Sequence, residues 1–373
     1  MTSSICWVHI GDLHMEEADG WLSRERLDRI VAEVNSCVGD SADFVFLPGD
    51  NANHATPEQY RMIVEALDPL LLPWRAIAGD HDFEPGDLAN FEAAIPIANR
   101  PESEVIAGHR CIFLDIVSAG AGGPDFRVTR HHRNRLLREL ARAEAEDQTA
   151  LVFMHAYPGD LAADGTAIAQ ALGDAGVGFV DTGHTHYSEL LNDGRVIYGA
   201  TRSTGQIEEG NGKPGFSIVC VHDRNPSWRF RELDGPWPHV QIVSPCDIRL
   251  MTRPSDPRQV PRPGEITISA KLFGTERPGP VFVRIDGSDE EEMWLIDGLW
   301  SAKRRIDEPG LHRIEVLCGD ASDQIEILVR DVEAVPKRDL PVAPGHDCHA
   351  IGAWPVAGIE GTQLGPNKNG RDW

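Results

Sequence analysis

The chain has 373 residues, of which 41% are hydrophobic and 25% charged, an ordinary globular composition with enough length for two domains. The formal net charge of -24 disfavours nucleic-acid polymers and anionic membranes as general partners. A small anionic substrate stays compatible with this charge, because bound metal cations would dominate the local field of a site.

Strand-like and helix-like segments alternate over the first 235 residues, which predicts an α/β domain with helices flanking a sheet or a pair of sheets. Strands are expected at Ile5–Ile10, Phe44–Leu47, Trp74–Ala78, Arg110–Asp115, Ala150–Met154, Phe179–Thr182, Val196–Gly199 and Phe216–Val221. Helical spacing marks Trp21–Ser36, Pro57–Leu67 and Arg130–Ala145. Thr56 is expected as an N-cap, with Pro57 at the first helical position.

The pattern changes near residue 236, after which short alternating strands are separated by Gly and Pro turns. They are expected at Glu265–Leu272, Val281–Ile285, Met293–Ile296, Leu299–Arg305, His312–Cys318 and Gln324–Val329. This spacing predicts a small all-β, Ig-like sandwich. We therefore expect a first domain at 1–238, a β-sandwich at 239–335 and an irregular, Gly- and Pro-rich tail at 336–373, with Trp354 anchoring the tail on the folded part.

The seven cysteines are scattered, odd in number and without a CxxC pair. This usage predicts reduced thiols rather than a disulfide framework, with Cys6 as a small core residue. The first residues have no basic region and no apolar signal core, and no apolar run approaches the length of a membrane span. We therefore expect a cytoplasmic protein with no membrane partner.

Asp and His residues follow the expected strands of the first domain, nearly all at strand ends. The series is Asp12-Leu13-His14, Gly49-Asp50, Gly79-Asp80-His81-Asp82, His155 and Gly183-His184-Thr185-His186. Any one of these is better explained as a turn residue or a satisfied histidine. Together they predict a metal site, because strand ends in an open α/β sheet converge on one crevice. Asp and His suit hard or borderline divalent cations, and two such cations side by side suit hydrolysis of a phosphate ester.

This ordered series resembles the signature of the calcineurin-like metallophosphoesterases, and the resemblance covers residues 1 to about 235. It implies a layered α/β/β/α sandwich. The segment Ser203-Thr204-Gly205-Gln206 and the turn Pro214-Gly215-Phe216 look like the cyclic-nucleotide phosphodiesterase branch, although this second likeness is much less specific.

Position by position, the resemblance implies two divalent cations, Mn or Fe, with Zn as an alternative. Asp12, His14 and His186 would hold the first cation, and Asp80, His155 and His184 the second. Asp50 would bridge the two, since one carboxylate has two oxygens. A water between two cations loses a proton near neutral pH and attacks a small phosphodiester, while His81 assists the leaving oxygen.

Asp80 departs from the family pattern, which usually has Asn at this position. A third carboxylate should bind the second cation more tightly and lower its Lewis acidity. Because of Asp80, a non-catalytic binding scaffold stays open beside the phosphodiesterase. A phosphomonoesterase acting on a small metabolite stays open as well, because the metal core is common to both kinds of esterase. Substrate choice is expected in the loops Asp82–Arg100 and Tyr157–Ala175. The sandwich is expected to bind a partner, to form a homo-oligomer or to cap the crevice.

His54 and Asp82 are candidates for residues that orient a ligand histidine or His81. Asn51 and Asn53 are better explained by turn chemistry than by substrate contact. The tail segment His346-Asp347-Cys348-His349 looks like a metal cluster but is isolated in the sequence.

Overall fold

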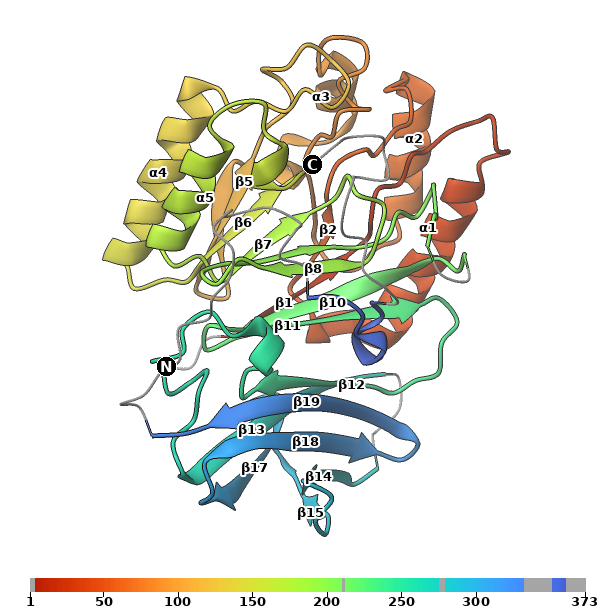
Figure 1. Cartoon of the computed structure of the whole chain (residues 1–373). Coiled ribbons are helices and arrows are strands. Elements are labelled where there is room, and N and C mark those ends of the chain that lie inside the picture. Colours follow the sequence, from red (N-terminus) through yellow and green to blue (C-terminus); the bar gives the residue numbers. More distant parts are fainter. Residues whose placement is uncertain (1–3, 210–211, 275–278, 332–350, 360–373) are drawn as a thin grey trace.

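A computed structural model describes residues 4–209, 212–274, 279–331 and 351–359. Figure 1 shows an α/β part in which two sheets lie between two sets of helices, with a separate pair of antiparallel sheets packed below it. The layered α/β/β/α sandwich and the added all-β part are therefore confirmed.

The two central sheets contain five and six strands. The first has the order β11 (Asn225–Glu232), β10 (Gly215–His222), β1 (Ser4–His9), β2 (Phe44–Leu47) and β3 (Trp74–Ala76). The second has the order β4 (Ser103–Ile106), β5 (His109–Leu114), β6 (Ala150–Met154), β7 (Phe179–Thr182), β9 (Ile197–Ala200) and β8 (Glu189–Asn192). Strands β1 to β3 run parallel, as do β5, β6, β7 and β9. Each sheet therefore presents the carboxyl ends of parallel strands along one edge.

Helices cover the outer faces of both sheets (Figure 1). They are α1 (Leu22–Glu33), α2 (Pro57–Leu67), α3 (Ala89–Ala94), α4 (Arg130–Ala145) and α5 (Gly165–Asp174). Helix α2 begins as predicted: the Thr56 side chain accepts a hydrogen bond from the Gln59 backbone N–H, and the Gln59 side-chain oxygen accepts one from the Thr56 backbone N–H. Shorter turns are the π-helical η1 (Val34–Val38) and the 3₁₀ segments η2 (Gly39–Ser41), η3 (Ile97–Asn99), η4 (Pro158–Asp160), η5 (Ile248–Leu250) and η7 (Pro355–Ala357).

Aromatic side chains fill the space between the two central sheets. The cluster includes Trp7, Phe44, Phe46, Phe153 and Phe179, all of them fully buried or nearly so. Their rings meet in stacked and edge-on pairs with centroids 4.8 to 6.0 Å apart. Such a core is rigid as well as stabilising, because large rings in contact have few alternative arrangements.

The sandwich consists of two four-stranded sheets. One has the order β12 (His239–Ser244), β13 (Gly264–Phe273), β17 (Leu299–Ile306) and β16 (Trp294–Ile296). The other has the order β15 (Glu291–Glu292), β14 (Val281–Ile285), β18 (Gly310–Cys318) and β19 (Ala321–Val329). The domain boundaries given above stay predictions, and the one at residue 335 falls outside the described residues.

Several elements escape the sequence patterns. Helices α3 and α5 lie inside the two segments interpreted as loops, and α5 was hidden by its Gly- and Ala-rich composition.

Strand β11 was missed because its Arg229 is charged. This side chain is nevertheless buried against Asp323 of β19, with Nε 2.9 Å from the carboxylate. Asp323 also accepts a hydrogen bond from the backbone of Ile242 at 2.7 Å. A buried ion pair therefore joins the α/β part to the sandwich.

Trp354 anchors the described part of the tail, as expected, and it does so at the junction between the α/β part and the sandwich. Its ring is 3% exposed and lies under the guanidinium groups of Arg229 and Arg249, at 4.9 and 4.1 Å from the ring centroid. Cation–π contacts of this kind favour arginine over desolvated indole. The cluster His346-Asp347-Cys348-His349 lies outside the described residues.

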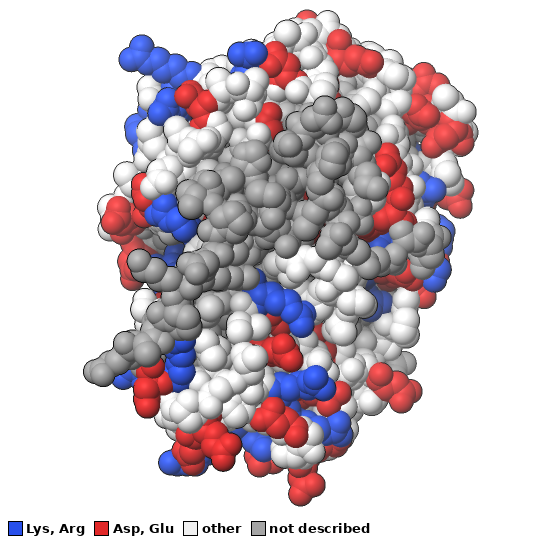
Figure 2. Space-filling model, viewed as in Figure 1, with Lys and Arg blue, Asp and Glu red and all other residues white. Residues whose placement is uncertain are grey.

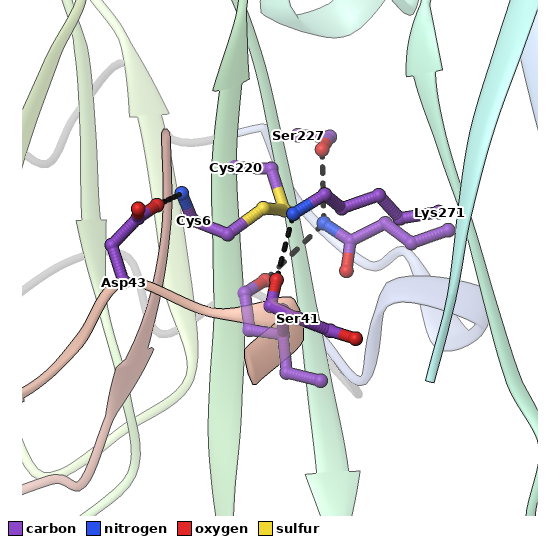
Figure 3. Close-up of a disulfide and its surroundings, with 8 residues drawn as sticks. Cys6, Ser41, Asp43, Cys220, Ser227 and Lys271 are labelled. Atoms are coloured by element: carbon purple, nitrogen blue, oxygen red, sulfur yellow. Dashed lines mark hydrogen bonds between the residues drawn. A yellow bond between two sulfur atoms is a disulfide. The ribbon is translucent and has the colours of Figure 1, made fainter. Parts of the chain in front are cut away.

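A disulfide joins Cys6 of β1 to Cys220 of β10, so the expectation of reduced thiols is wrong for this pair (Figure 3). The two residues are direct partners in the antiparallel ladder, with Cα atoms 4.1 Å apart. Sequence could not show this pairing, because 214 residues separate the cysteines and only the sheet register places them opposite each other. Since disulfides are typical of oxidising compartments, cysteine usage no longer supports a cytoplasmic location.

Acidic and basic side chains are interspersed among the coloured residues on the face drawn in Figure 2. Within the described residues, no helix has both the length and the apolar character needed to cross a bilayer.

Non-reducing peptide mapping should recover the peptides of Cys6 and Cys220 as one linked species. Replacing both residues by Ala should lower the free energy of unfolding by about 2–5 kcal/mol, because the bond closes a long loop in the unfolded chain. Denaturant unfolding under non-reducing conditions measures this loss. Recovery of the two peptides separately, with free thiols, would contradict the pairing.

Candidate metal centre

The predicted ligand residues come together in loops at the carboxyl ends of strands from both sheets. Asp12 follows β1, Asp50 follows β2, and Asp80 lies in the turn beyond β3. His155 follows β6 directly, and the His184–His186 turn follows β7. These six side chains and that of His14, which lies in the first loop, are 0 to 6% exposed. The convergence expected from strand order is therefore what the fold produces.

Two groups of donor atoms lie close enough to hold a metal ion. Asp50, Asp80, His155 and His184 form one group, with His155 Nε2 3.1 Å from Asp80 Oδ1 and 3.4 Å from Asp50 Oδ2. His184 Nδ1 lies 3.3 Å from the same Asp80 oxygen. This group contains the predicted second-metal set together with the predicted bridge.

The second group contains His14, Asp50 and His81. His14 Nε2 lies 3.6 Å from Asp50 Oδ2 and 2.8 Å from His186 Nε2. Asp50 belongs to both groups, which is the placement expected of a bridging carboxylate.

Asp12 and His186 stand next to these groups rather than within them. Asp12 Oδ2 accepts a hydrogen bond from the His184 backbone at 2.8 Å and lies 4.0 Å from His186 Nε2. Asp12 Oδ1 is buried and has no hydrogen-bond partner among the described residues. An orphaned, buried carboxylate oxygen fits a position prepared for a cation. The division of the ligands between two metals, and the catalytic role of His81, stay predictions.

Hydrogen bonds to the outer ring nitrogens orient the histidines. His14 Nδ1 donates to Asn53 Oδ1 at 3.0 Å, and His155 Nδ1 donates to the Pro48 carbonyl at 2.8 Å. In both cases Nε2 is left facing the carboxylates of the centre. This is the usual arrangement of ligand histidines, whose second nitrogen is held by an acceptor outside the metal site.

The charges of the centre are consistent with a cation-binding donor set. Burial lowers the pKa of His14 to about 4 and that of His186 to about 3, so both imidazoles are neutral ligands near pH 7. Burial would raise the pKa of Asp80, but hydrogen bonds and charge from His155 and His184 hold it well below its usual range. Burial raises the pKa of Asp12 well above its usual range. The buried carboxylates repel one another, and divalent cations would relieve that repulsion.

Glycines before the ligands make room for the packing of the ligand loops. A Cβ at Gly49 would meet His155 Nδ1, one at Gly79 would meet Asp50 Oδ1, and one at Gly183 would meet Asp12 Oδ1, each closer than 3.0 Å. The Gly-Asp and Gly-His motifs therefore have a steric cause.

Four of the ligand residues have left-handed backbone conformations. The φ values are 40° for His14, 48° for Asp50, 68° for His184 and 64° for His186. Residues other than Gly adopt this region at a cost, and such conformations cluster at functional sites.

Asp82 ties two ligand loops together. Its Oδ2 accepts hydrogen bonds from the backbones of Asn51 and Gly79 at 3.1 and 2.9 Å, and its Oδ1 accepts from Ala52 and the Tyr60 hydroxyl. The sequence suggested that Asp82 orients a histidine; it instead accepts hydrogen bonds from the backbone of the ligand loops after β2 and β3. The deep burial of Asp82 and its bond to Tyr60, 22 residues away in sequence, were not readable from the local motif.

Asn53 orients His14, a role that the interpretation as turn chemistry missed. His54 lies beside it, with Nδ1 2.8 Å from Glu84 Oε2 near the surface. Gln206 comes from the segment singled out in the sequence, and its side chain donates to Asn53 Oδ1 at 3.2 Å. The Ser203 hydroxyl donates to the Asp12 carbonyl at 2.8 Å, so this segment packs directly on the first ligand loop.

A family model matches the part of the chain that contains the centre. Residues 8–188 match the family model described as calcineurin-like phosphoesterase. No curated protein matches the chain.

Solved structures with a similar fold include a dimetal phosphatase from Danio rerio, with 12% identity, 62% of this chain and 99% of that chain covered, and a TM-score of 0.47. A putative 5′-nucleotidase from Staphylococcus aureus has 13% identity and a TM-score of 0.40, and the match covers 63% of this chain and 55% of that chain. GAP50 of Plasmodium, an anchor in the inner membrane complex, has 13% identity and a TM-score of 0.44, and the match covers 62% of this chain and 85% of that chain. At these TM-scores the likenesses say nothing about what this chain acts on.

The variant Gly183→Ala should reduce the metal content of the purified protein, because the new Cβ would displace Asp12 and the first ligand loop. Elemental analysis after saturation with Mn²⁺ measures this loss. Gly279→Ala is the matched control, since its Cβ would meet nothing within 4 Å. Equal metal content in the two variants would contradict the steric account.

Proposed function

We propose, from the premise that this chain contains a calcineurin-like phosphoesterase domain, that the protein is a binuclear-metal-dependent hydrolase of a small phosphodiester. A cyclic nucleotide is one substrate of that class. The observation that carries the proposal is the position of Asp50, whose carboxylate belongs to both groups of donor atoms. A shared carboxylate between two donor sets is the feature that a two-metal centre requires.

Two divalent cations fit the residues present, Mn or Fe with Zn as the alternative. One would be held by Asp12, His14 and His186, the other by Asp80, His155 and His184, with Asp50 shared. When bound, such cations supply Lewis acidity that neutralises a phosphate group and lowers the pKa of water at the centre. Oxygen and imidazole donors suit these metals, and no thiolate takes part.

In this proposal His81 hands a proton to the leaving oxygen. Its backbone N–H donates to Asp50 Oδ1 at 2.9 Å and its Nδ1 donates to the Asn53 carbonyl at 2.8 Å, which fixes the ring. Burial opposes charge on this imidazole, but the nearby carboxylates, Asp50 first, outweigh it and raise the pKa of His81. A partly exposed imidazole with a raised pKa carries the proton that the leaving oxygen needs, on Nε2.

The choice of a diester rests on the resemblance of the segment containing Gln206, which reaches Asn53 at the centre. A phosphomonoesterase acting on a small metabolite is the alternative within the same chemistry. Asp80 favours a second alternative, a non-catalytic scaffold, because a carboxylate in place of Asn makes the second metal a weaker Lewis acid.

The proposal also covers the partners of the protein. The net charge of -24 supports a small substrate over a nucleic-acid polymer or a membrane. A homo-oligomer formed through the sandwich completes the proposal. The cytoplasmic location expected from the sequence is not part of it, because the Cys6–Cys220 disulfide is typical of oxidising compartments.

Hydrolysis of bis-p-nitrophenyl phosphate in the presence of Mn²⁺ should exceed that of p-nitrophenyl phosphate. His81→Ala should lower kcat for the diester by roughly 10²–10⁴-fold, the usual contribution of a general acid, while two Mn²⁺ ions remain bound. Preference for the monoester would favour the phosphomonoesterase. Metal binding without turnover of any phosphate ester in a screen of cyclic nucleotides, diesters and monoesters would favour the scaffold.

The variant Asp80→Asn should weaken binding of the second Mn²⁺ by at least about tenfold, because a charged ligand becomes neutral. A loss of about tenfold follows even from mutation of residues that only hydrogen-bond to metal ligands. Turnover per fully loaded centre should rise, since the metal becomes the stronger Lewis acid. Calorimetric titration and kcat at saturating Mn²⁺ measure the two effects separately. Unchanged affinity would contradict the effect assigned to the third carboxylate.

A further inference from the structure

A polar cluster of Trp7, His9 and Asp181 is enclosed in the aromatic core between the two central sheets. His9 ends β1 and Asp181 lies in β7, and all three side chains are fully buried. His9 Nδ1 lies 2.6 Å from Asp181 Oδ1, and the Trp7 indole N–H donates to Asp181 Oδ2. The pair therefore links a strand of the five-stranded sheet to a strand of the six-stranded sheet.

A gain in folding stability does not by itself explain why His9 and Asp181 are paired in the core. Its surroundings are apolar: the His9 ring meets Phe46 edge-on with centroids 5.6 Å apart, and the Trp7 ring meets Phe153 and Phe179. Replacing a buried ion pair by well-packed apolar side chains is often neutral or stabilising. What a directional contact adds in such a place is a fixed distance between the two strands.

That distance matters because the two strands lead straight into ligand loops. Two residues separate His9 from Asp12, and two separate Asp181 from His184. The same loops meet again at the centre, where the His184 backbone donates to Asp12 Oδ2 at 2.8 Å. A shift of β1 against β7 would therefore be passed to the metal ligands over a short stretch of chain.

We propose that His9 and Asp181 are positioning residues that fix the spacing of the Asp12 and His184 loops, and so the affinity of the centre for two divalent cations. This inference rests on the proposed function only in requiring that the centre binds metal. Neither residue belongs to the two groups of donor atoms.

The test compares Mn²⁺ binding by calorimetric titration in three full-length variants. His9→Leu removes the contact with Asp181, and the Mn²⁺ affinity of this variant should fall by about tenfold or more. A loss of this size is usual for residues that orient metal ligands without binding the metal themselves. His9→Asn places an amide donor near the former Nδ1 and should restore binding close to that of the wild-type protein.

Asp323→Asn is the matched control, because it removes the charge from the equally buried pair with Arg229 at the sandwich junction. It should lower the thermal midpoint of the metal-free protein and leave Mn²⁺ affinity unchanged. Asp181→Asn, which keeps the shape of the side chain, replaces His9→Leu if that variant does not fold.

Wild-type Mn²⁺ affinity in the folded His9→Leu or Asp181→Asn protein would overturn the positioning role alone. Equal losses of affinity in Asp323→Asn would also overturn it, because they would reflect general destabilisation. Absence of Mn²⁺ binding in the wild-type protein would instead overturn the proposed function, and this inference with it.

Discussion

The mutual repulsion of three buried carboxylates, Asp12, Asp50 and Asp80, is the constraint on which the centre depends. Burial of charge is costly unless opposite charge or hydrogen bonds compensate it. Imidazoles from the other sheet supply part of this compensation, and His155 lies within 3.4 Å of both Asp50 and Asp80. Divalent cations would supply the rest. The left-handed conformations of four ligand residues show that the loops are held in place by their surroundings, since the backbone would not choose this geometry by itself.

The ligands come from both sheets, so the sheets must keep a constant separation. The aromatic core between them gives stiffness, and the contact of His9 with Asp181 gives one defined distance. Within its own sheet, β1 is also linked covalently to the neighbouring strand β10 by the disulfide of Cys6 and Cys220. Strand β1, which leads to the first ligand, is thus held on two sides by contacts to distant parts of the chain.

The sandwich is joined to this framework through buried polar contacts. Asp323 binds both Arg229 of the five-stranded sheet and the backbone of β12, and Trp354 from the tail covers the same arginine. Breaking one partner of a buried pair leaves an uncompensated charge, so the two parts are held together firmly. A sandwich fixed in this way is part of the body of the protein.

Sequence by itself determined the fold class and the strand-end ligand series, because strand order and side-chain chemistry are local properties of the chain. The shared position of Asp50 was expected only from the resemblance to a known family. Sequence did not show the Cys6–Cys220 bond, the burial of Arg229 or the cross-sheet contact of His9, nor that Asp82 binds the backbone of two ligand loops. Each of these depends on residues far apart in sequence that meet only through sheet register and packing. Local patterns predict which residue types reach the crevice, whereas the tertiary structure decides which of them touch and at what distance.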